Sequence, residues 1–272
     1  MRMAAGRLWR DYGLVLVIAL LLASVYLLPP DTSLAEVEEA GTLRVCVPAS
    51  YPPLVTGDPA EPGIDVDLLK SVAAELGVEL SLTHVAAMGR DFNPRGWRLT
   101  RAQCQVLAGG ILDSPTTRGF LDVTRPIAET GWAVLGKERP GDLAGRTAGV
   151  LVGASGLDRI ALSSLIRSLG IRTVLVGTPE ALAAGIEEGR FEIGITEALL
   201  AAWLAGKHQW RTEWLGGGLE RHPVTFGLWK GDLTLKRAIG AALSRMAEDG
   251  REAAILRRYL GGSAAFIGPA PG

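Results

Sequence analysis

The residues best suited to chemistry in this 272-residue chain are three histidines, two cysteines and a serine in a glycine-rich turn. His84, His208 and His222 are scattered, without the spacing of a metal site. Ser155 lies in the segment Val-Gly-Ala-Ser-Gly, residues 152–156, where the second glycine comes one residue too early for a nucleophile elbow. The sequence contains no phosphate loop and no dinucleotide fingerprint. These residues therefore predict neither an enzyme nor a bound cofactor.

The two cysteines, Cys46 and Cys104, each lie in a short apolar run that is typical of a buried strand. In an oxidising compartment an even number of cysteines favours a disulfide. If the two runs are neighbouring strands of one sheet, a bond between them is geometrically reasonable. Two buried free thiols are the alternative, and a metal site is not expected from one pair without a nearby histidine.

The N-terminus indicates export from the cytoplasm. Three arginines precede an almost unbroken apolar run over residues 14–28, which describes an export signal or a membrane anchor. The run is long for a signal peptide and short for a spanning helix, which needs roughly 20 residues. Ser33, Leu34 and Ala35 have the spacing for cleavage after Ala35, so cleavage and retention both remain open. We interpret residues 1–35 as a signal peptide or anchor, with residues 13–30 as the tether if it is retained.

The composition excludes one class of partner. The hydrophobic fraction is 48% and the formal net charge is -1, which are ordinary values for a globular protein. No basic region exists that would attract nucleic acid. A nucleic-acid partner is therefore not expected, whereas a small ligand is left open.

Strand-like and helix-like segments alternate after the apolar run and would position any functional residue. A first series has strands at 43–47, 78–82 and 104–112 and a helix at 65–76, with Asp65 as its N-cap. A second series has strands at 148–152, 172–176 and 191–196 and helices at 157–169 and 178–189. Such alternation predicts parallel sheets covered by helices.

Two such series predict two lobes. Extended apolar segments near 130–135 and 223–228 would connect them, and two closing helices, 233–247 and 251–260, would return to the first lobe. We therefore expect lobe one to contain residues 36–133 and 225–262, lobe two residues 134–224, and residues 263–272 to form a loose tail.

A series of short motifs follows this order of elements. They are Gly-Thr-Leu-Arg-Val (41–45), Tyr-Pro-Pro-Leu (51–54), Gly-Ile-Asp-Val-Asp-Leu (63–68), Gly-Gly-Ile (109–111), Thr-Thr-Arg (116–118), Gly-Ala-Ser (153–155), Gly-Arg-Phe-Glu (189–192) and Asp-Gly (249–250). Together they resemble the type II periplasmic solute-binding proteins of family 3, which serve polar amino acid ABC transporters. The resemblance covers residues 34–261 and implies a two-lobed α/β fold with a parallel-sheet core in each lobe and an N-terminal apolar helix.

The resemblance also implies which residues bind the ligand's carboxylate. Arg118 matches the arginine of that family, and its planar two-donor fork suits a carboxylate. Gly153, Ala154 and Ser155 match a turn whose backbone N–H groups would face an anion at a helix start. A solvated surface arginine and a routine strand-to-helix turn are the alternatives.

The other end of the ligand would meet a second set of residues. Glu197 matches the acid that pairs with the ligand's ammonium, although an acid that caps a helix is the alternative. Tyr51 and Gly110 would line the site. The family's acid near the start is replaced by Pro48, and Asp113 either substitutes for this acid or caps its loop.

These matches predict a non-catalytic periplasmic protein that captures an amino acid or organic acid between its lobes for an inner-membrane ABC permease. Residues 44–46, Cys104 and residues 124–126 faintly resemble a second group, whose members accompany periplasmic quinoprotein dehydrogenases and bind a protein partner. A dehydratase-like enzyme on the same fold is the third reading.

Overall fold

The computed structural model describes residues 13, 15–23, 30–88, 94–153 and 156–268. The chain divides into two compact units, Met1–Thr32 and Ser33–Gly272. In the first unit residue 13 and residues 15–23 are helical, while residues 14 and 24–28 of the apolar run lie outside the described residues. Within the described part of the chain, no helix has both the length and the apolar character needed to span a membrane.

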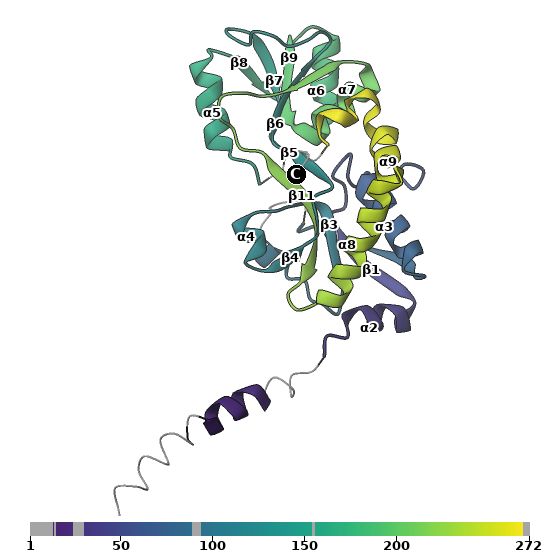
Figure 1. Cartoon of the computed structure of the whole chain (residues 1–272). Coiled ribbons are helices and arrows are strands. Elements are labelled where there is room, and N and C mark those ends of the chain that lie inside the picture. The colour runs from purple at the N-terminus through teal and green to yellow at the C-terminus, as the bar shows by residue number, and fades with distance from the viewer. Residues whose placement is uncertain (1–12, 14, 24–29, 89–93, 154–155, 269–272) are drawn as a thin grey trace, which may run out of the picture. The chain divides into compact units, whose positions relative to one another are not determined.

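The second unit contains two sheets, each the core of one lobe (Figure 1). The first is formed by β1 (Thr42–Val47), β2 (Glu79–His84), β3 (Val106–Leu112), β4 (Leu121–Val123), β5 (Ala128–Thr130) and β11 (His222–Trp229). Its order is β2-β1-β3-β11-β4, with β5 also paired to β11. The β2-β1-β3 core is parallel, as predicted, and β11 adds antiparallel pairings to β3, β4 and β5.

The second sheet has the order β10-β6-β9-β7-β8. Its strands are β6 (Trp132–Gly136), β7 (Thr147–Val150), β8 (Arg172–Leu175), β9 (Ile193–Glu197) and β10 (Arg211–Trp214). The β9-β7-β8 part is parallel, and β6 and β10 extend it in antiparallel fashion. The two-lobed α/β fold is therefore confirmed, with mixed rather than purely parallel sheets.

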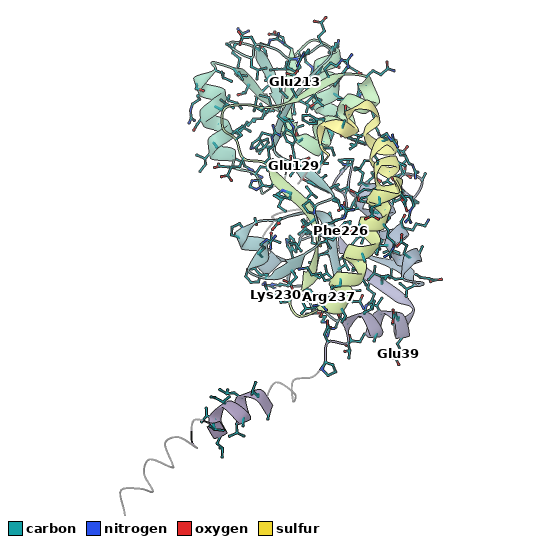
Figure 2. All side chains as sticks on the ribbon, in the orientation of Figure 1. Glu39, Glu129, Glu213, Phe226, Lys230 and Arg237 are labelled. Atoms are coloured by element: carbon teal, nitrogen blue, oxygen red, sulfur yellow. A yellow bond between two sulfur atoms is a disulfide. The ribbon has the colours of Figure 1, made fainter. Side chains whose placement is uncertain are left out.

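Helices cover both sheets. They are α2 (Ser33–Ala40), α3 (Ile64–Glu75), α4 (Pro115–Arg118), α5 (Arg159–Ser168), α6 (Pro179–Glu187), α7 (Ala198–His208), α8 (Leu233–Glu248) and α9 (Arg251–Leu260), with short 3₁₀ turns η1 (Pro94–Trp97) and η2 (Gly261–Phe266). The start of α6 follows the predicted chemistry, because the hydroxyl of Thr178 accepts from Ala181 N and Pro179 is the first helical residue. In lobe one the fully buried Phe226 anchors β11 in the core (Figure 2).

Two predictions about local structure are wrong. Asp65 does not cap α3, which begins at Ile64 after Gly63 and has no side-chain cap. The tail is not loose over residues 263–268, because η2 packs on α7 and α9 and Ile267 is fully buried. The buried apolar side chain of Ile267 explains this order, and residues 269–272 lie outside the described part.

The cysteines form the expected disulfide. Cys46 lies in β1 and Cys104 just before β3, its parallel neighbour, and their Cα atoms are 5.6 Å apart. This distance is typical of a disulfide.

The chain crosses between the lobes at a point where space is limited. It leaves the first sheet after Thr130 and enters the second at Trp132. A Cβ atom on the intervening Gly131 would lie 3.2 Å from both the carbonyl oxygen of Glu220 and the ring of Trp214, which precede β11 on the return path. Glycine therefore allows the two crossing segments to approach closely.

Candidate functional site

Arg118 is the last residue of α4, a one-turn helix at the edge of lobe one. Ser114 begins this helix, because its hydroxyl accepts from Thr117 N at 3.1 Å, and Pro115 follows at the first helical position. The Arg118 side chain is 62% exposed and its fork binds a carboxylate of the same chain. Nε and Nη2 donate to the two carboxylate oxygens of Asp113 at 2.5 and 2.7 Å.

The role of Asp113, for which the sequence allowed either a ligand-binding acid or a loop cap, follows from its contact with Arg118. Asp113 neither caps α4, which Ser114 does, nor stands free to hold an amine; it pairs with Arg118. This hydrogen bond raises the pKa of Arg118, so the guanidinium stays charged. The guanidinium fork of Arg118 therefore already holds a carboxylate of the same chain.

Glu197 is the corresponding residue of lobe two, and it is buried, with 3% exposure. It ends β9 and caps α7: its carboxylate accepts from Leu199 N at 3.1 Å and from Leu200 N at 3.0 Å. The hydroxyl of Thr130 in β5 donates to the same group. Burial raises the pKa of Glu197 to about 7, outweighing the two backbone donors that lower it.

Asp65 is a second buried acid, and the sequence interpretation missed its role. One oxygen, Oδ2, accepts from Gly109 N at 2.6 Å, and the backbone N–H of Gly110 also acts to lower the pKa of this carboxyl. The other oxygen, Oδ1, has no hydrogen-bond partner among the described residues. Burial raises the pKa of Asp65 to about 7. A signal was available, because Asp65 shares its helix face with the apolar Leu69 and Val72, where a charged residue is unexpected.

Tyr51 connects the two buried acids. It follows β1, where Tyr51 N donates to Val55 O at 2.6 Å. The pKa of Tyr51 lies well above its ordinary value, first because of burial and then because of the negative charges of Glu197 and Asp65. Both carboxyls are therefore within electrostatic range of one phenol, with Asp65 contributed by lobe one and Glu197 by lobe two.

The glycine turn of lobe two is placed only in part. Gly153 O accepts from the guanidinium of Arg159 at 2.8 Å, while Ala154 and Ser155 lie outside the described residues. The following helix begins later than predicted, at Arg159, because Asp158 caps it by accepting from two backbone N–H groups. Its N-terminus therefore lies four residues beyond Ser155. Gly110, the last predicted residue, lies in β3 directly after Gly109, which donates to Asp65.

The segment that resembles the accessory proteins has a structural role here. The hydroxyl of Thr124 accepts from Phe226 N at 3.0 Å. The guanidinium of Arg125 binds the carboxylate of Glu252 and the carbonyl of Leu243, which ties the β4–β5 segment to α8 and α9.

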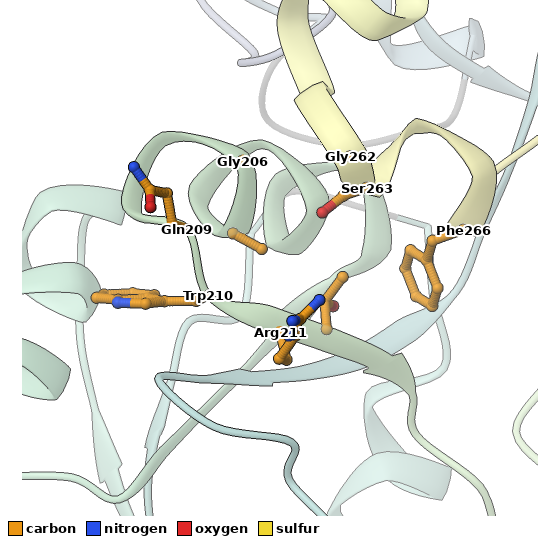
Figure 3. Close-up of a pocket in the computed structure, with 9 residues that line it drawn as sticks. Gly206, Gln209, Trp210, Arg211, Gly262, Ser263 and Phe266 are labelled. Atoms are coloured by element: carbon orange, nitrogen blue, oxygen red, sulfur yellow. The ribbon is translucent and has the colours of Figure 1, made fainter.

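A separate hollow of about 450 Å³ lies on lobe two between α7, β10 and η2 (Figure 3). Its polar lining includes Gln209, Arg211 and Ser263, with Trp210 and Phe266 as its aromatic residues. Among the predicted site residues that the structure describes, none lines this hollow. Across the described ranges, no group of histidine, cysteine and acidic side chains is arranged to hold a metal ion.

Comparison with known proteins identifies the class of fold. Residues 43–262 match the family model of bacterial extracellular solute-binding proteins, family 3. No curated protein sequence matches significantly.

Solved structures with the same fold are numerous. One is an ancestral cationic amino acid solute-binding protein, 20% identical, with a TM-score of 0.68 over 84% of this chain and 99% of its own. A polar amino acid ABC uptake substrate-binding protein from Streptococcus thermophilus is 17% identical, with a TM-score of 0.68 over 84% of this chain and 89% of its own. A substrate-binding protein from Streptococcus pneumoniae with bound histidine is 15% identical, with a TM-score of 0.59 over 86% and 98%.

Proposed function

Because the chain belongs to the bacterial extracellular solute-binding proteins of family 3, we propose that it captures an amino acid between its two lobes for an ABC-type uptake system. We also propose that the protein releases this ligand chemically unchanged and does not act as an enzyme. The observation that carries it is that the charges of two buried acids, Asp65 from lobe one and Glu197 from lobe two, both act on Tyr51. Both carboxyls are buried, and Asp65 Oδ1 has no hydrogen-bond partner among the described residues, so this pair suits a cationic group.

The proposed ligand orientation uses the charges of both lobes. Its ammonium, or a basic side chain, lies toward Glu197 and Asp65, where a cation favours the ionised carboxylates. Its carboxylate binds Arg118. The structural relatives support this class, since their descriptions name cationic amino acids and histidine.

Asp113 makes the carboxylate end of the site competitive. The fork of Arg118 donates two hydrogen bonds to Asp113, so a ligand carboxylate must replace this contact. Only the difference between the two contacts contributes to affinity. We therefore propose that Asp113 tunes the site toward ligands whose carboxylate is held by additional contacts.

Thermal unfolding of the full-length protein with L-arginine, L-histidine and L-glutamate tests this proposal. Agmatine, which is arginine without its carboxylate, is the matched control. A ligand at one hundred times its dissociation constant adds about 2.7 kcal/mol of stability. We expect arginine or histidine to raise the midpoint and agmatine to have a much smaller effect. A panel of amino and organic acids that produces no shift would sink the proposal.

The structure also bears on the N-terminal segment. Ser33 is 1% exposed, and its hydroxyl accepts from Leu235 N at 3.2 Å and bonds to the hydroxyl of Thr234 at 3.0 Å. Since Asp232 provides no side-chain cap for α8, Ser33 satisfies one of the free N–H groups at the start of this helix. Val37, one turn further, is fully buried.

We propose from this role that the mature chain keeps Ser33 and its apolar segment, which then tethers the protein to the outer face of the inner membrane. Cleavage after Ala35 would remove Ser33 and Leu34 and cost about 1 kcal/mol through the lost cap. The exposed apolar side chains of residues 15–18 and 20–22 suit a lipid environment. Intact-mass measurement on membrane-extracted protein checks this: a chain that begins at residue 36 contradicts the proposal.

A further inference from the structure

An apolar strand edge is left open at the end of the second sheet. β8 pairs with β7 on one side, and no described strand pairs with its other side (Figure 1). All four of its residues are exposed, with Val174 at 45% and Leu175 at 77%. Such an edge presents unpaired backbone groups and is a template for strand addition.

A groove of about 290 Å³ runs beside this edge, between β8 and α5. Its apolar lining consists of Val150, Val152, Leu162, Ile166, Ile171 and Leu175. Thr173 and Leu175 face the groove, as the two-residue period of a strand requires. We call this feature the β8 groove.

Two arginines of α5 also line the β8 groove, Arg159 and Arg167. Arg159 donates to Gly153 O and Arg167 to the hydroxyls of Ser163 and Ser164, all neutral groups. In the part of the chain that the structure describes, neither arginine forms an ion pair. Asp158, the acid that precedes Arg159 in the sequence, caps α5.

The geometry of the β8 groove constrains what can bind there. Eight residues separate the two arginines, which corresponds to about 12 Å along the helix axis. An extended chain advances about 3.4 Å per residue, so positions i and i+4 lie about 14 Å apart on one face, with i+2 between them. Acidic residues at i and i+4 would match the arginines, and an apolar residue at i+2 would cover Leu175.

We propose that the β8 groove binds an extended segment of a partner protein with the pattern acidic-x-apolar-x-acidic, which adds as a strand to the outer edge of β8. A second copy of this chain is disfavoured, because a two-fold contact through this edge would bring the arginines of one copy, Arg159, Arg167 and Arg172, near those of the other. A lipid surface is disfavoured because acyl chains cannot hydrogen-bond to the open strand edge.

Fluorescence anisotropy on the full-length protein tests the proposal with labelled peptides centred on Glu-Thr-Val-Thr-Glu. The controls are Lys-Thr-Val-Thr-Lys and the scrambled Glu-Glu-Thr-Thr-Val. We expect the alternating acidic peptide to bind at least tenfold more tightly than either control. The double variant Arg159→Glu/Arg167→Glu should abolish this preference, and Leu175→Asp should weaken binding several-fold.

A charge-matched control is Lys236→Glu/Arg237→Glu on α8 in lobe one, where Lys236 is half-buried and Arg237 is exposed (Figure 2). This variant should bind the acidic peptide like the unmodified protein. Equal binding of all three peptides, or an equal loss in the control variant, overturns the proposal. Dimerisation that Leu175→Asp abolishes would also overturn it, because the groove would then bind a second copy of the chain. Binding to phosphatidylglycerol vesicles that only the groove variants lose would overturn it in favour of a lipid surface. The amino-acid thermal shift is a separate readout, so either result can fail without the other.

Discussion

The carboxylates of the two lobes differ in what satisfies them. In lobe one the Asp113 carboxylate is bound to an exposed arginine, and one oxygen of Asp65 has no partner in the described part of the chain. In lobe two Glu197 is buried and accepts from two backbone N–H groups and one hydroxyl. The comparison teaches that burial alone does not distinguish a structural acid from a ligand-binding one. The number of acceptor positions still available is larger at Asp65 than at Glu197, so we expect Asp65 to contribute more than Glu197 to holding a ligand's cation.

The largest effect is expected for Glu197→Ala. This substitution removes the cap of α7 and leaves the hydroxyl of Thr130 without its acceptor, in a buried region. We expect a loss of about 2–3 kcal/mol in the free energy of unfolding, measured by urea denaturation. Thr212→Ala is a control with a smaller expected loss. Thr212 lies on the edge strand β10, and its half-buried hydroxyl donates to Val134 O of the neighbouring strand β6. An unchanged stability for Glu197→Ala would show that its cap contributes nothing.

The pH dependence of stability sharpens the comparison, because both buried acids have a raised pKa of about 7 in the folded state. In the unfolded chain such groups titrate near about 4. The folded protein therefore binds more protons between these values, and stability falls as pH rises from about 4 to about 7. Below this window the lowered pKa values of Glu75 and Asp249 have the opposite effect, because the stability that these two acids contribute is lost as the pH falls.

Urea midpoints across this pH range measure the effect. Asp65→Asn keeps an acceptor for the backbone of Gly109 and cannot ionise, so it should flatten the fall in stability. An identical pH profile for Asp65→Asn would contradict the assignment of this acid.

A moderate effect is expected for Asp113→Asn on ligand affinity. The neutral amide competes less well for the guanidinium of Arg118, so a carboxylate ligand should bind several-fold more tightly. Isothermal titration with arginine measures the change. Weaker binding would mean that Asp113 supports the site rather than competing for it.

The smallest stability effect is expected for Arg118→Ala. Its side chain is 62% exposed, and exposed ion pairs contribute little to folding. The urea midpoint should stay within error of the unmodified protein. A marked loss would assign Arg118 to the fold instead of the ligand.

Much of the fold was predictable because its signals are local. The start of helix α6 is predicted by the cap at Thr178 and by Pro179 at the first helical position. The strands next to the disulfide are predicted by short apolar runs. The start of α5 was placed too early, since the cap at Asp158 competes with the apolar pattern that begins at Leu157. The order of residues 263–268 depends on burial of Ile267, which no local pattern reveals.

The site was predictable as a set of residues but not as a set of contacts. Arg118 and Glu197 were found through motifs, yet their partners Asp113 and Thr130 are set by tertiary packing. Asp65 was interpreted as a helix cap because an acid at a helix start normally serves that purpose. Its true partner, Gly109, lies 44 residues away and is brought near by the sheet.

The measurement that tests the central claim most directly is isothermal titration of L-arginine and agmatine into the full-length protein and into Arg118→Ala. If Arg118 binds the ligand's carboxylate, arginine binds the unmodified protein at least tenfold more tightly than agmatine, and Arg118→Ala removes this difference while leaving stability intact. Equal affinities for the two compounds, or a preference for arginine that survives Arg118→Ala, would contradict the account.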